Sequence, residues 1–355
     1  MKELTGYADN HVHIDLFGEE NHVKAKTMLD ILAEKRVTDL SVLSYMPGCD
    51  VVSNLNTLWW KKNYKDIKIR AFGCFHEDDH YKDVPYEKQY ERLMELGCDG
   101  IKFIQMKPDR RKQLGKGINH PSYEAAFALM EADGTPITLH SGDPQDNWDI
   151  TKTSEYAIKH GWFYGDGSFP SCEQIYSEDF EVLERHPKLN VTFAHFFFLS
   201  EQMDRVRRIF DKYPGVRFDL APGGEMFLGF SKDIDRWHDF FEEYSDRIIF
   251  GTDCADIKKP ESNIALTDSV REVLRHDRSV YNMPIYGGYT VKGLDLSDET
   301  YEKICYSNYI SFVGDRVKDI DDASFLAAAE QMYCDLKDLP EYERSTAWLK
   351  TLIFV

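Results

Sequence analysis

Short apolar runs typical of β-strands alternate with amphipathic helical stretches along most of this 355-residue chain. Most of the runs consist of Val, Ile, Leu and Phe without polar alternation, as expected for strands that are covered on both faces. This alternation of strands and helices predicts βα units and a parallel sheet. The expected strands span residues 7–14, 39–45, 69–75, 99–104, 136–141, 190–196, 216–221 and 248–253. Eight such units predict an α/β fold, and specifically a (β/α)8 TIM barrel.

Helices are expected in the gaps between these strands. Apolar residues at helical spacing predict them at 23–35, 86–96, 178–186, 201–213 and 233–244. The connections after the fourth, fifth and eighth strands are long, and the connection at 141–170 is polar, Gly-rich and aromatic. One domain is expected over residues 1–355, with the barrel at about 6–314 and a helical C-terminal extension at about 315–355.

Charge and cysteine content exclude several classes of partner. The net charge of −19 argues against nucleic acid or an anionic membrane, because both favour surfaces rich in Lys and Arg. Seven cysteines without Cys-x-x-Cys spacing argue against a disulfide framework or a cysteine zinc site. No signal peptide or membrane-spanning stretch is recognisable, so a cytoplasmic protein with a small-molecule partner is expected. The composition leaves open whether the chain forms a homo-oligomer.

Five of the expected strands carry a side chain suited to metal chemistry at or near the carboxyl end. These side chains are His11 and His13, Lys102, His140, His195 and Asp253. In a barrel of parallel strands, all carboxyl ends meet at one face, where the active site is built. Residues far apart in the sequence are therefore expected to surround one small volume.

The first strand contributes a His-x-His pair. Because strand side chains repeat every second residue, Asp9, His11 and His13 are expected on one face. Such a pair needs no metal when it stands alone. Polar residues at the ends of other strands change that interpretation, and together they favour a metal site. Zinc, iron and manganese accept mixtures of imidazole and carboxylate ligands.

Further matching pieces extend through nearly the whole expected barrel. They are Asp9–His13, Gly100–Lys102, Leu139-His140, Arg185–Leu189 before Ala194-His195, Phe218-Asp219, Asp246–Asp253 and Ser307–Tyr309. Together these pieces resemble the amidohydrolase superfamily, and specifically its amidohydrolase-related branch. That branch includes aminocarboxymuconate-semialdehyde decarboxylase, the resorcylate decarboxylases and several lactonases. The resemblance implies a TIM-barrel enzyme with a divalent metal.

The resemblance also implies a role for each matching position. The metal ligands would be His11, His13, His140 and Asp253. Asp253 would be a ligand or a near-ligand that handles protons, and His195 would bind the substrate, the metal-bound water or the metal. Lys102 would be carboxylated in a two-metal centre and need not touch metal in a one-metal centre. One ion is favoured, with zinc first and manganese or iron as alternatives; some lactonases of the branch work without metal.

The same residues serve more than one reaction. Metal-activated water could attack an ester, lactone or amide, with Asp253 as general base and the metal or His195 stabilising the oxyanion. The ion could instead hold a hydroxyl and a carboxylate of the substrate during non-oxidative decarboxylation, with Asp253 or His195 protonating carbon. A metal-dependent hydrolase is the first prediction and a decarboxylase the second. A catalytically inactive barrel that binds a ligand is the third, because the fold alone does not decide function.

Basic residues after the fourth strand indicate an anionic substrate. They are Lys107, Arg110, Arg111, Lys112 and Lys116. Arg110 and Arg111 are predicted to bind a substrate carboxylate at the mouth of the barrel, because arginine pairs with carboxylate through two parallel hydrogen bonds. A solvated surface loop is the alternative. His76, at the end of the third strand, is a third candidate contact, and Phe196–Phe198 are expected to make the pocket wall bulky beside His195.

Overall fold

A computed structural model describes residues 4–45, 52–77, 81 and 83–353. Its main sheet consists of parallel strands. They are β1 (Tyr7–His13), β2 (Val37–Leu43), β3 (Lys68–Gly73), β4 (Gly100–Met106), β5 (Pro136–Ser141), β6 (Asn190–Phe193), β7 (Val216–Asp219), β8 (Ile248–Ile249) and β9 (Cys254–Ala255). Their order in the sheet is β8-β7-β6-β5-β4-β3-β2-β1-β9, so each strand from β1 to β7 neighbours the next along the chain, and β9 neighbours β1.

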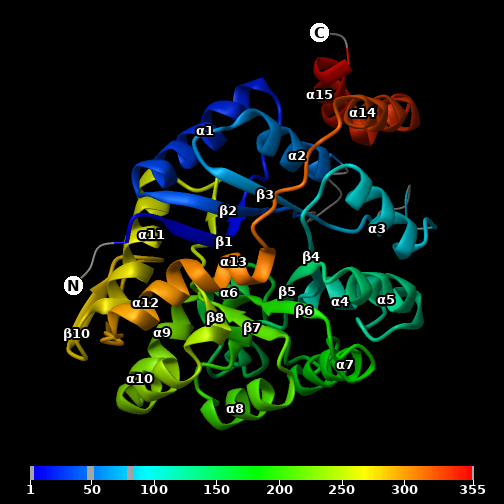
Figure 1. The fold of residues 1–355 in the computed structure, drawn as a ribbon. Helices are drawn as coiled ribbons and strands as arrows, with labels where there is room; N and C mark the ends of the chain where they lie inside the picture. The colour runs from blue at the N-terminus through cyan, green and yellow to red at the C-terminus, as the bar shows by residue number, and fades with distance from the viewer. Residues whose placement is uncertain (1–3, 46–51, 78–80, 82, 354–355) are drawn as a thin grey trace.

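The two edge strands of this order belong to one segment of the chain. β8 pairs with β7, whereas β9 pairs with β1. Between them, the N–H of Asn10 donates to the carbonyl of Phe250 at 3.0 Å, and the N–H of Asp253 donates to the carbonyl of His11 at 2.9 Å. The sheet therefore closes on itself, and helices surround it (Figure 1). The predicted TIM barrel is confirmed, but of the expected strand 248–253 only Ile248–Ile249 forms a strand, and β9 follows just beyond it at Cys254–Ala255.

Helices connect the strands and cover the barrel. They are α1 (Glu19–Glu34), α2 (Ser53–Asn63), α3 (Tyr86–Glu95), α4 (Pro108–Leu114), α5 (Glu124–Asp133), α6 (Glu155–Lys159), α7 (Cys172–Arg185), α8 (Met203–Lys212), α9 (Gly224–Ser231), α10 (Ile234–Glu243), α11 (Pro260–Arg275), α12 (Asp298–Glu302), α13 (Asn308–Val313), α14 (Asp322–Leu336) and α15 (Glu343–Ile353). The five predicted helices correspond to α1, α3, α7, α8 and α10. Helix α7 begins at Cys172, earlier than predicted, because the side chain of Ser171 caps it by accepting from the N–H of Gln174.

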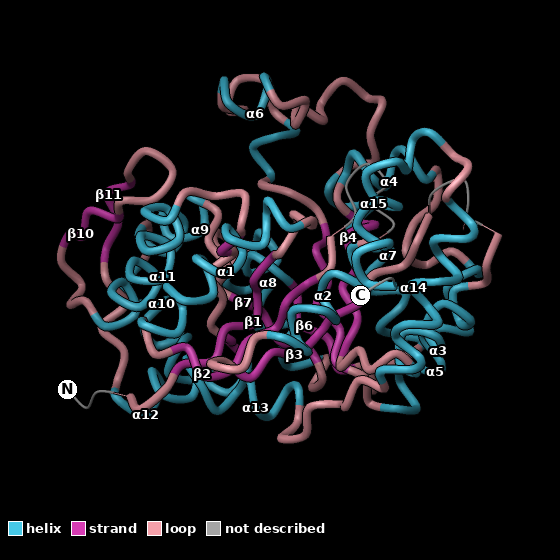
Figure 2. The backbone as a smooth tube through the Cα atoms, turned by 90° about the horizontal axis from the view of Figure 1, so that it is seen from above, coloured by secondary structure: helices cyan, strands magenta, loops and turns pink. Residues whose placement is uncertain are grey.

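Two features lie outside the simple barrel. An antiparallel hairpin of β10 (Val280–Met283) and β11 (Tyr289–Lys292), which the sequence pattern did not predict, packs against α9. The predicted long connection after β5 contains α6 and extends away from the body (Figure 2). The connection that contains α6 follows a barrel strand, and such connections lie on the side of a TIM barrel that carries the active site. The hairpin lies between α11 and α12.

The last part of the chain is helical, as predicted. Helices α14 and α15 pack against each other and lie near α2 in Figure 1. The indole ring of Trp348 lies 5.8 Å from the ring of Phe17, in the loop after β1, and Lys62 of α2 pairs with Asp322 at 2.7 Å. The boundary between barrel and extension near residue 314 stays a prediction.

Two further observations concern the whole described chain. None of its helices combines the length and the apolar character that crossing a membrane requires. Cysteines at positions 74, 98, 172, 254, 305 and 334 are free thiols, and Cys49 lies outside the described residues.

Candidate metal centre

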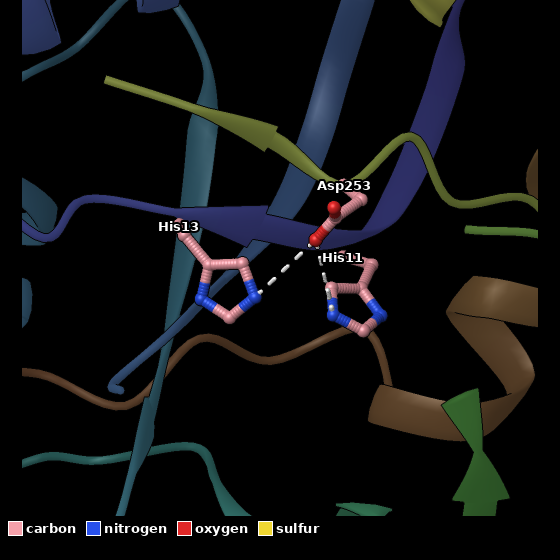
Figure 3. A group of neighbouring side chains, drawn as sticks. All are labelled: His11, His13 and Asp253. Atoms are coloured by element: carbon pink, nitrogen blue, oxygen red, sulfur yellow. Dashed lines mark ion pairs between the residues drawn. The ribbon is translucent and has the colours of Figure 1, made fainter. Parts of the chain in front are cut away.

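The carboxyl ends of β1 and β8 bring together three of the predicted ligands. His11, His13 and Asp253 each offer one ligand atom, and these atoms all lie within 4.8 Å of one another. The Oδ1 atom of Asp253 is 3.7 Å from Nε2 of His11 and 3.6 Å from Nε2 of His13. Figure 3 shows both rings turned toward the carboxylate. The expected convergence of β1 and β8 is therefore present in the fold.

A second pair of imidazoles adjoins this group. Nε2 of His195 lies 3.2 Å from Nδ1 of His140, and the ring centroids of His195 and His11 are 5.1 Å apart. The structure thus places His140 beside His195, next to the group of His11, His13 and Asp253. Whether His140 is a metal ligand stays a prediction.

Each of the four imidazoles has one ring nitrogen held by an oxygen. The pairs are His11 Nδ1 with Asp219 Oδ2 at 2.9 Å, His13 Nδ1 with the Leu43 carbonyl at 3.0 Å, His195 Nδ1 with the Ala221 carbonyl at 3.0 Å, and His140 Nε2 with Asp143 Oδ1 at 3.4 Å. Carbonyl and carboxylate oxygens only accept hydrogen bonds, so these nitrogens carry the ring proton. The other nitrogen of each neutral ring then holds a lone pair.

Burial keeps these rings neutral. It lowers the pKa of His11 well below its ordinary value, that of His13 to about 3 and that of His195 to about 4. The pKa of His140 is lowered by burial as well. At neutral pH, the nitrogen lone pairs of His11 and His13 therefore face Oδ1 of Asp253, and those of His140 and His195 face each other. Lone pairs this close repel each other unless a cation lies among them, so the donor set fits a divalent metal.

Asp253 is an anion in this setting. Burial alone would raise its pKa, but the positive charge of Lys258 opposes burial most strongly, and the pKa is held below its ordinary value. The backbone of Asp253 is left-handed, with φ of 54°. A residue other than glycine adopts this conformation at a cost of about 1–3 kcal/mol, and such strain is concentrated at functional sites.

Lys102 borders the centre from β4. Its Nζ lies 3.4 Å from Nε2 of His11, and its side chain is fully buried. Burial lowers the pKa of Lys102 to about 8, against the raising effect of Asp219 and Asp253. The ammonium is thus easier to deprotonate than that of an exposed lysine.

Asp219, at the end of β7, organises the centre but was not among the predicted site residues. Its Oδ2 accepts from Nδ1 of His11 at 2.9 Å and from Nδ2 of Asn10 at 3.3 Å. Its Oδ1 accepts from the N–H of His195 at 2.9 Å and from the N–H of Ala221 at 3.2 Å. The signal available in the sequence was an acidic residue within the expected strand 216–221. Asp143 and Lys258 were missed as well. They follow the predicted ligands His140 and Asp253 in their loops, where a single charged residue is no specific signal.

Asp9 does not join the two histidines of β1. The pairing of β1 with β2 shifts register between Asp9 and Val12, which breaks the regular alternation of side chains. The carboxylate of Asp9 instead accepts from the hydroxyl of Thr252 at 2.6 Å and from the N–H of His11 at 3.0 Å. Burial raises the pKa of Asp9 to about 7. The expectation of one shared face therefore holds only for His11 and His13.

The predicted substrate contacts already have partners within the protein. Arg111 makes two hydrogen bonds to Glu178, at 2.9 and 2.8 Å, which commits its guanidinium to the fold. Arg110 donates to Gln113 at 2.9 Å. Nε2 of His76 lies 3.3 Å from Nδ2 of Asn54. Binding of substrate by Arg110, Arg111 or His76 stays a prediction, and Arg111 is the least available of the three.

The three consecutive phenylalanines after His195 point to different surroundings. Residues 194–198 form a short turn in which His195, Phe196 and Phe197 have φ between 52° and 57°. Phe196 and Phe197 are fully buried, whereas the ring of Phe198 lies 5.6 Å from His140 and 5.4 Å from His195. The left-handed backbone separates the three rings, so only Phe198 adjoins the imidazole pair.

Comparisons with known proteins identify the family of this chain and support its fold. A family model described as amidohydrolase matches residues 11–309. The TIM-barrel protein Bb4693 from Bordetella bronchiseptica is 13% identical, with a TM-score of 0.53 over 87% of this chain and 99% of that chain. The 4-oxalomesaconate hydratase from Rhodopseudomonas palustris is 10% identical, with a TM-score of 0.50 over 93% of this chain and 99% of that chain. At these identities, both structures bear on the fold alone.

One curated protein has a short likeness to this chain. The protein ORF104b of Acidianus filamentous virus 2 (isolate Italy/Pozzuoli), described as a zinc finger protein, is 31% identical over 55 residues. The match covers 15% of this chain and 53% of the viral protein, so this chain spans about half the length of that relative.

Proposed function

The chain belongs to the amidohydrolase family, and on that premise we propose that it is a metal-dependent hydrolase of a small, carboxylated ester, lactone or amide. One observation carries the proposal. Four imidazoles each have one nitrogen bound to a protein oxygen. The other nitrogens of His11 and His13 face the carboxylate of Asp253, and those of His140 and His195 face each other in the adjoining pair. Unprotonated nitrogens beside a carboxylate can bind a cation, whereas they would add no stability to a packed core.

His11, His13 and Asp253 would hold the ion, with His140 and His195 completing its surroundings. Zinc is our first choice and manganese or iron the alternatives, because imidazole-rich sites with one carboxylate suit these ions. We propose one ion, since the atoms of His11, His13 and Asp253 form a single group within 4.8 Å. When bound, such an ion lowers the pKa of a coordinated water toward neutrality and polarises a carbonyl.

The protein's own groups would supply proton transfer and orientation. Asp253 is ionised, so Oδ1 can accept a proton from the attacking water and pass it to the leaving group. His195 is held through Nδ1 by the Ala221 carbonyl, so its Nε2, which lies 3.2 Å from Nδ1 of His140, would accept a hydrogen bond from the substrate or the water. Phe198 packs against both His140 and His195 and would restrict the orientation of a substrate there. These three residues act at fixed positions, which is the main requirement for efficient catalysis.

Non-oxidative decarboxylation is the second candidate. The donors form two adjoining pairs, His11 with His13 and His140 with His195, and this arrangement suits a substrate that presents both a hydroxyl and a carboxylate. Asp253 or His195 would then protonate carbon as carbon dioxide leaves. Product analysis separates the two reactions: hydrolysis yields a new acid with an alcohol or amine, whereas decarboxylation releases carbon dioxide.

The first experiment measures metal and activity together. Protein purified without chelator should contain about one zinc, manganese or iron ion per chain, as this ligand set implies. It should hydrolyse at least one member of a panel of carboxylated esters, lactones and amides, and the His13→Ala variant should lose both metal and activity. A catalytically inactive binding barrel predicts the opposite: no metal, and ligand binding that survives His13→Ala. Absence of metal, with no activity gained on adding it, would refute the proposed function.

We also propose that the partner of this site is a small molecule. The net charge of −19 supports this, since nucleic acid and anionic membranes repel such a surface. Self-association into a homo-oligomer is compatible with this function, and sedimentation at several protein concentrations would measure it.

A further inference from the structure

Lys258 holds Asp253 at two points. Its Nζ donates to the side-chain Oδ2 of Asp253 at 2.8 Å and also to the main-chain carbonyl of the same residue. The side chains of Lys258 and Asp253 are 22% and 24% exposed, so the pair lies at the edge of the centre and is largely shielded from water. One ammonium therefore restrains both the backbone and the carboxylate of a residue whose φ is 54°.

This contact gives the two oxygens of the Asp253 carboxylate different partners. Oδ2 is taken by Lys258, whereas Oδ1 faces Nε2 of His11 and Nε2 of His13 at 3.7 and 3.6 Å. A carboxylate that turned about its Cβ–Cγ bond would present both oxygens, or neither, to the same nitrogens. The ammonium of Lys258 prevents that rotation, because the rotation would break a charge-assisted hydrogen bond that is largely shielded from water.

We propose that Lys258 is a positioning residue for the metal centre: it presents Asp253 to the cation through Oδ1 alone. The inference rests on the proposed function, since it concerns the same site. A carboxylate limited to one oxygen favours a compact, nitrogen-rich coordination sphere over the oxygen-rich spheres that calcium requires. No sequence motif marks Lys258, because the contact depends on the turn between β9 and α11.

The segment that carries Lys258 is held in place by other residues. The carboxylate of Asp256 accepts from the N–H groups of Asp15 and Leu16, both at 3.0 Å. The side chain of Asn263 bonds the N–H and the carbonyl of Ala255, at 3.1 and 3.0 Å. Removing the ammonium of Lys258 should therefore change the restraint on Asp253 and leave the surrounding backbone in position.

The chain offers a matched control for this substitution. Lys61, in α2, donates to Oδ2 of Asp99 and to the carbonyl of Gly97, both at 2.7 Å. It thus makes the same pair of contacts, to one carboxylate and one main-chain carbonyl. Neither Lys61 nor Asp99 contacts His11, His13 or Asp253 through any interaction of the described residues. A loss caused only by breaking a buried Lys–Asp pair should appear equally in Lys61→Met and Lys258→Met.

The experiment is a competition titration of metal-stripped protein with zinc and a chromophoric chelator. Lys258→Met should weaken zinc affinity by about 10–100-fold, as expected when a partner that orients a ligand is lost. Lys61→Met should leave zinc affinity within about twofold of the wild type. Its thermal unfolding should nevertheless show a loss of stability at least as large as that of Lys258→Met, because the Lys61–Asp99 pair is the more deeply buried one. Lys258→Arg should recover most of the affinity, because a guanidinium can donate both to Oδ2 and to the main-chain carbonyl of Asp253.

Several outcomes overturn the inference. If Lys258 competed with the cation for Asp253, Lys258→Met would bind zinc as tightly as the wild type or more tightly. An equal loss of affinity in Lys61→Met would assign the effect to general destabilisation. Should Lys258→Met fail to fold, Lys258→Gln takes its place, since it keeps a donor without the charge and must still weaken zinc binding. A wild type that binds no zinc refutes the proposed function itself, which separates that failure from a failure specific to Lys258.

Discussion

Replacing Asp219 by Asn should weaken metal binding through His11, although Asp219 is not itself a predicted metal ligand. Asp219 accepts four hydrogen bonds, two at each oxygen, and one of them comes from Nδ1 of His11. An amide has only one accepting oxygen, and the N–H groups of His195 and Ala221 are fixed in the backbone and require it. The amide nitrogen must then face His11. It donates a proton where the carboxylate accepted one, so the ring of His11 moves its own proton from Nδ1 to Nε2.

That change of tautomer has two measurable consequences. Nε2 of His11 loses the lone pair that faces Asp253, so metal affinity should fall by about 10–100-fold. The side-chain N–H of Asn10 also loses its acceptor, Oδ2 of Asp219. One unsatisfied buried donor costs about 1–3 kcal/mol of unfolding free energy. Neutralising a carboxylate whose pKa burial already raises offsets part of this loss. We therefore expect Asp219→Asn to fold with slightly reduced stability and strongly reduced metal affinity.

The assay combines urea unfolding with zinc titration of the stripped protein. Asp99→Asn is the control, because Asp99 is a buried carboxylate that accepts from Lys61 and from the N–H groups of Ala71 and Lys318. It should lose stability without losing zinc affinity. The tautomer argument is refuted if Asp219→Asn binds zinc like the wild type, or if Asp99→Asn loses affinity to the same degree.

The remaining predictions concern pH, the basic loop and the aromatic wall. Burial raises the pKa of Glu225 from 4.5 to about 7, so the folded chain binds more protons than the unfolded chain between these values, and this residue makes stability fall as pH rises through that window. The change in unfolding free energy across this window amounts to at most about 3 kcal/mol. Glu225→Gln should reduce the pH dependence of the unfolding free energy, measured by urea unfolding from pH 4.5 to 8. An unchanged pH dependence would contradict the assignment. Arg111→Met should lower the unfolding free energy by about 3–5 kcal/mol, because it leaves the buried Glu178 charge unpaired. Arg110→Met should change stability little, and it should raise KM if Arg110 binds a substrate carboxylate. Phe198→Ala should leave metal content unchanged and alter KM or kcat, and steady-state kinetics with a bulkier substrate would detect the wider pocket; an identical specificity profile would count against a role for this wall.

Much of the barrel was predictable because strands buried on both faces need apolar residues at nearly every position. The expected strand 99–104, for example, lies almost wholly within β4, whose residues are all buried. The hairpin of β10 and β11 lacked such a signal, since Val280 is 60% exposed and the hairpin depends on packing against α9. The turn at Ala194–Phe198 was hidden for a related reason. Four positive φ values, at His195 and the three phenylalanines, contradict local preference and persist because the surrounding core holds Phe196 and Phe197.

At the centre, the order of residues along the chain already determined which side chains meet. Parallel strands must end on the same face, so His11, His13, His140, His195 and Asp253 could be placed together before any coordinates were known. Which nitrogen of each ring faces inward depends on Asp219, Asp143 and two carbonyls, and these come from other strands and loops. Asp143 lies three residues after His140, whereas the other three partners lie 26 to 208 residues from their histidines. None of these contacts leaves a periodic signal, because the closed geometry of the barrel selects them. The one-sided orientation of Asp253 under Lys258 is of the same kind: a contact made in space, with no pattern in the chain that predicts it.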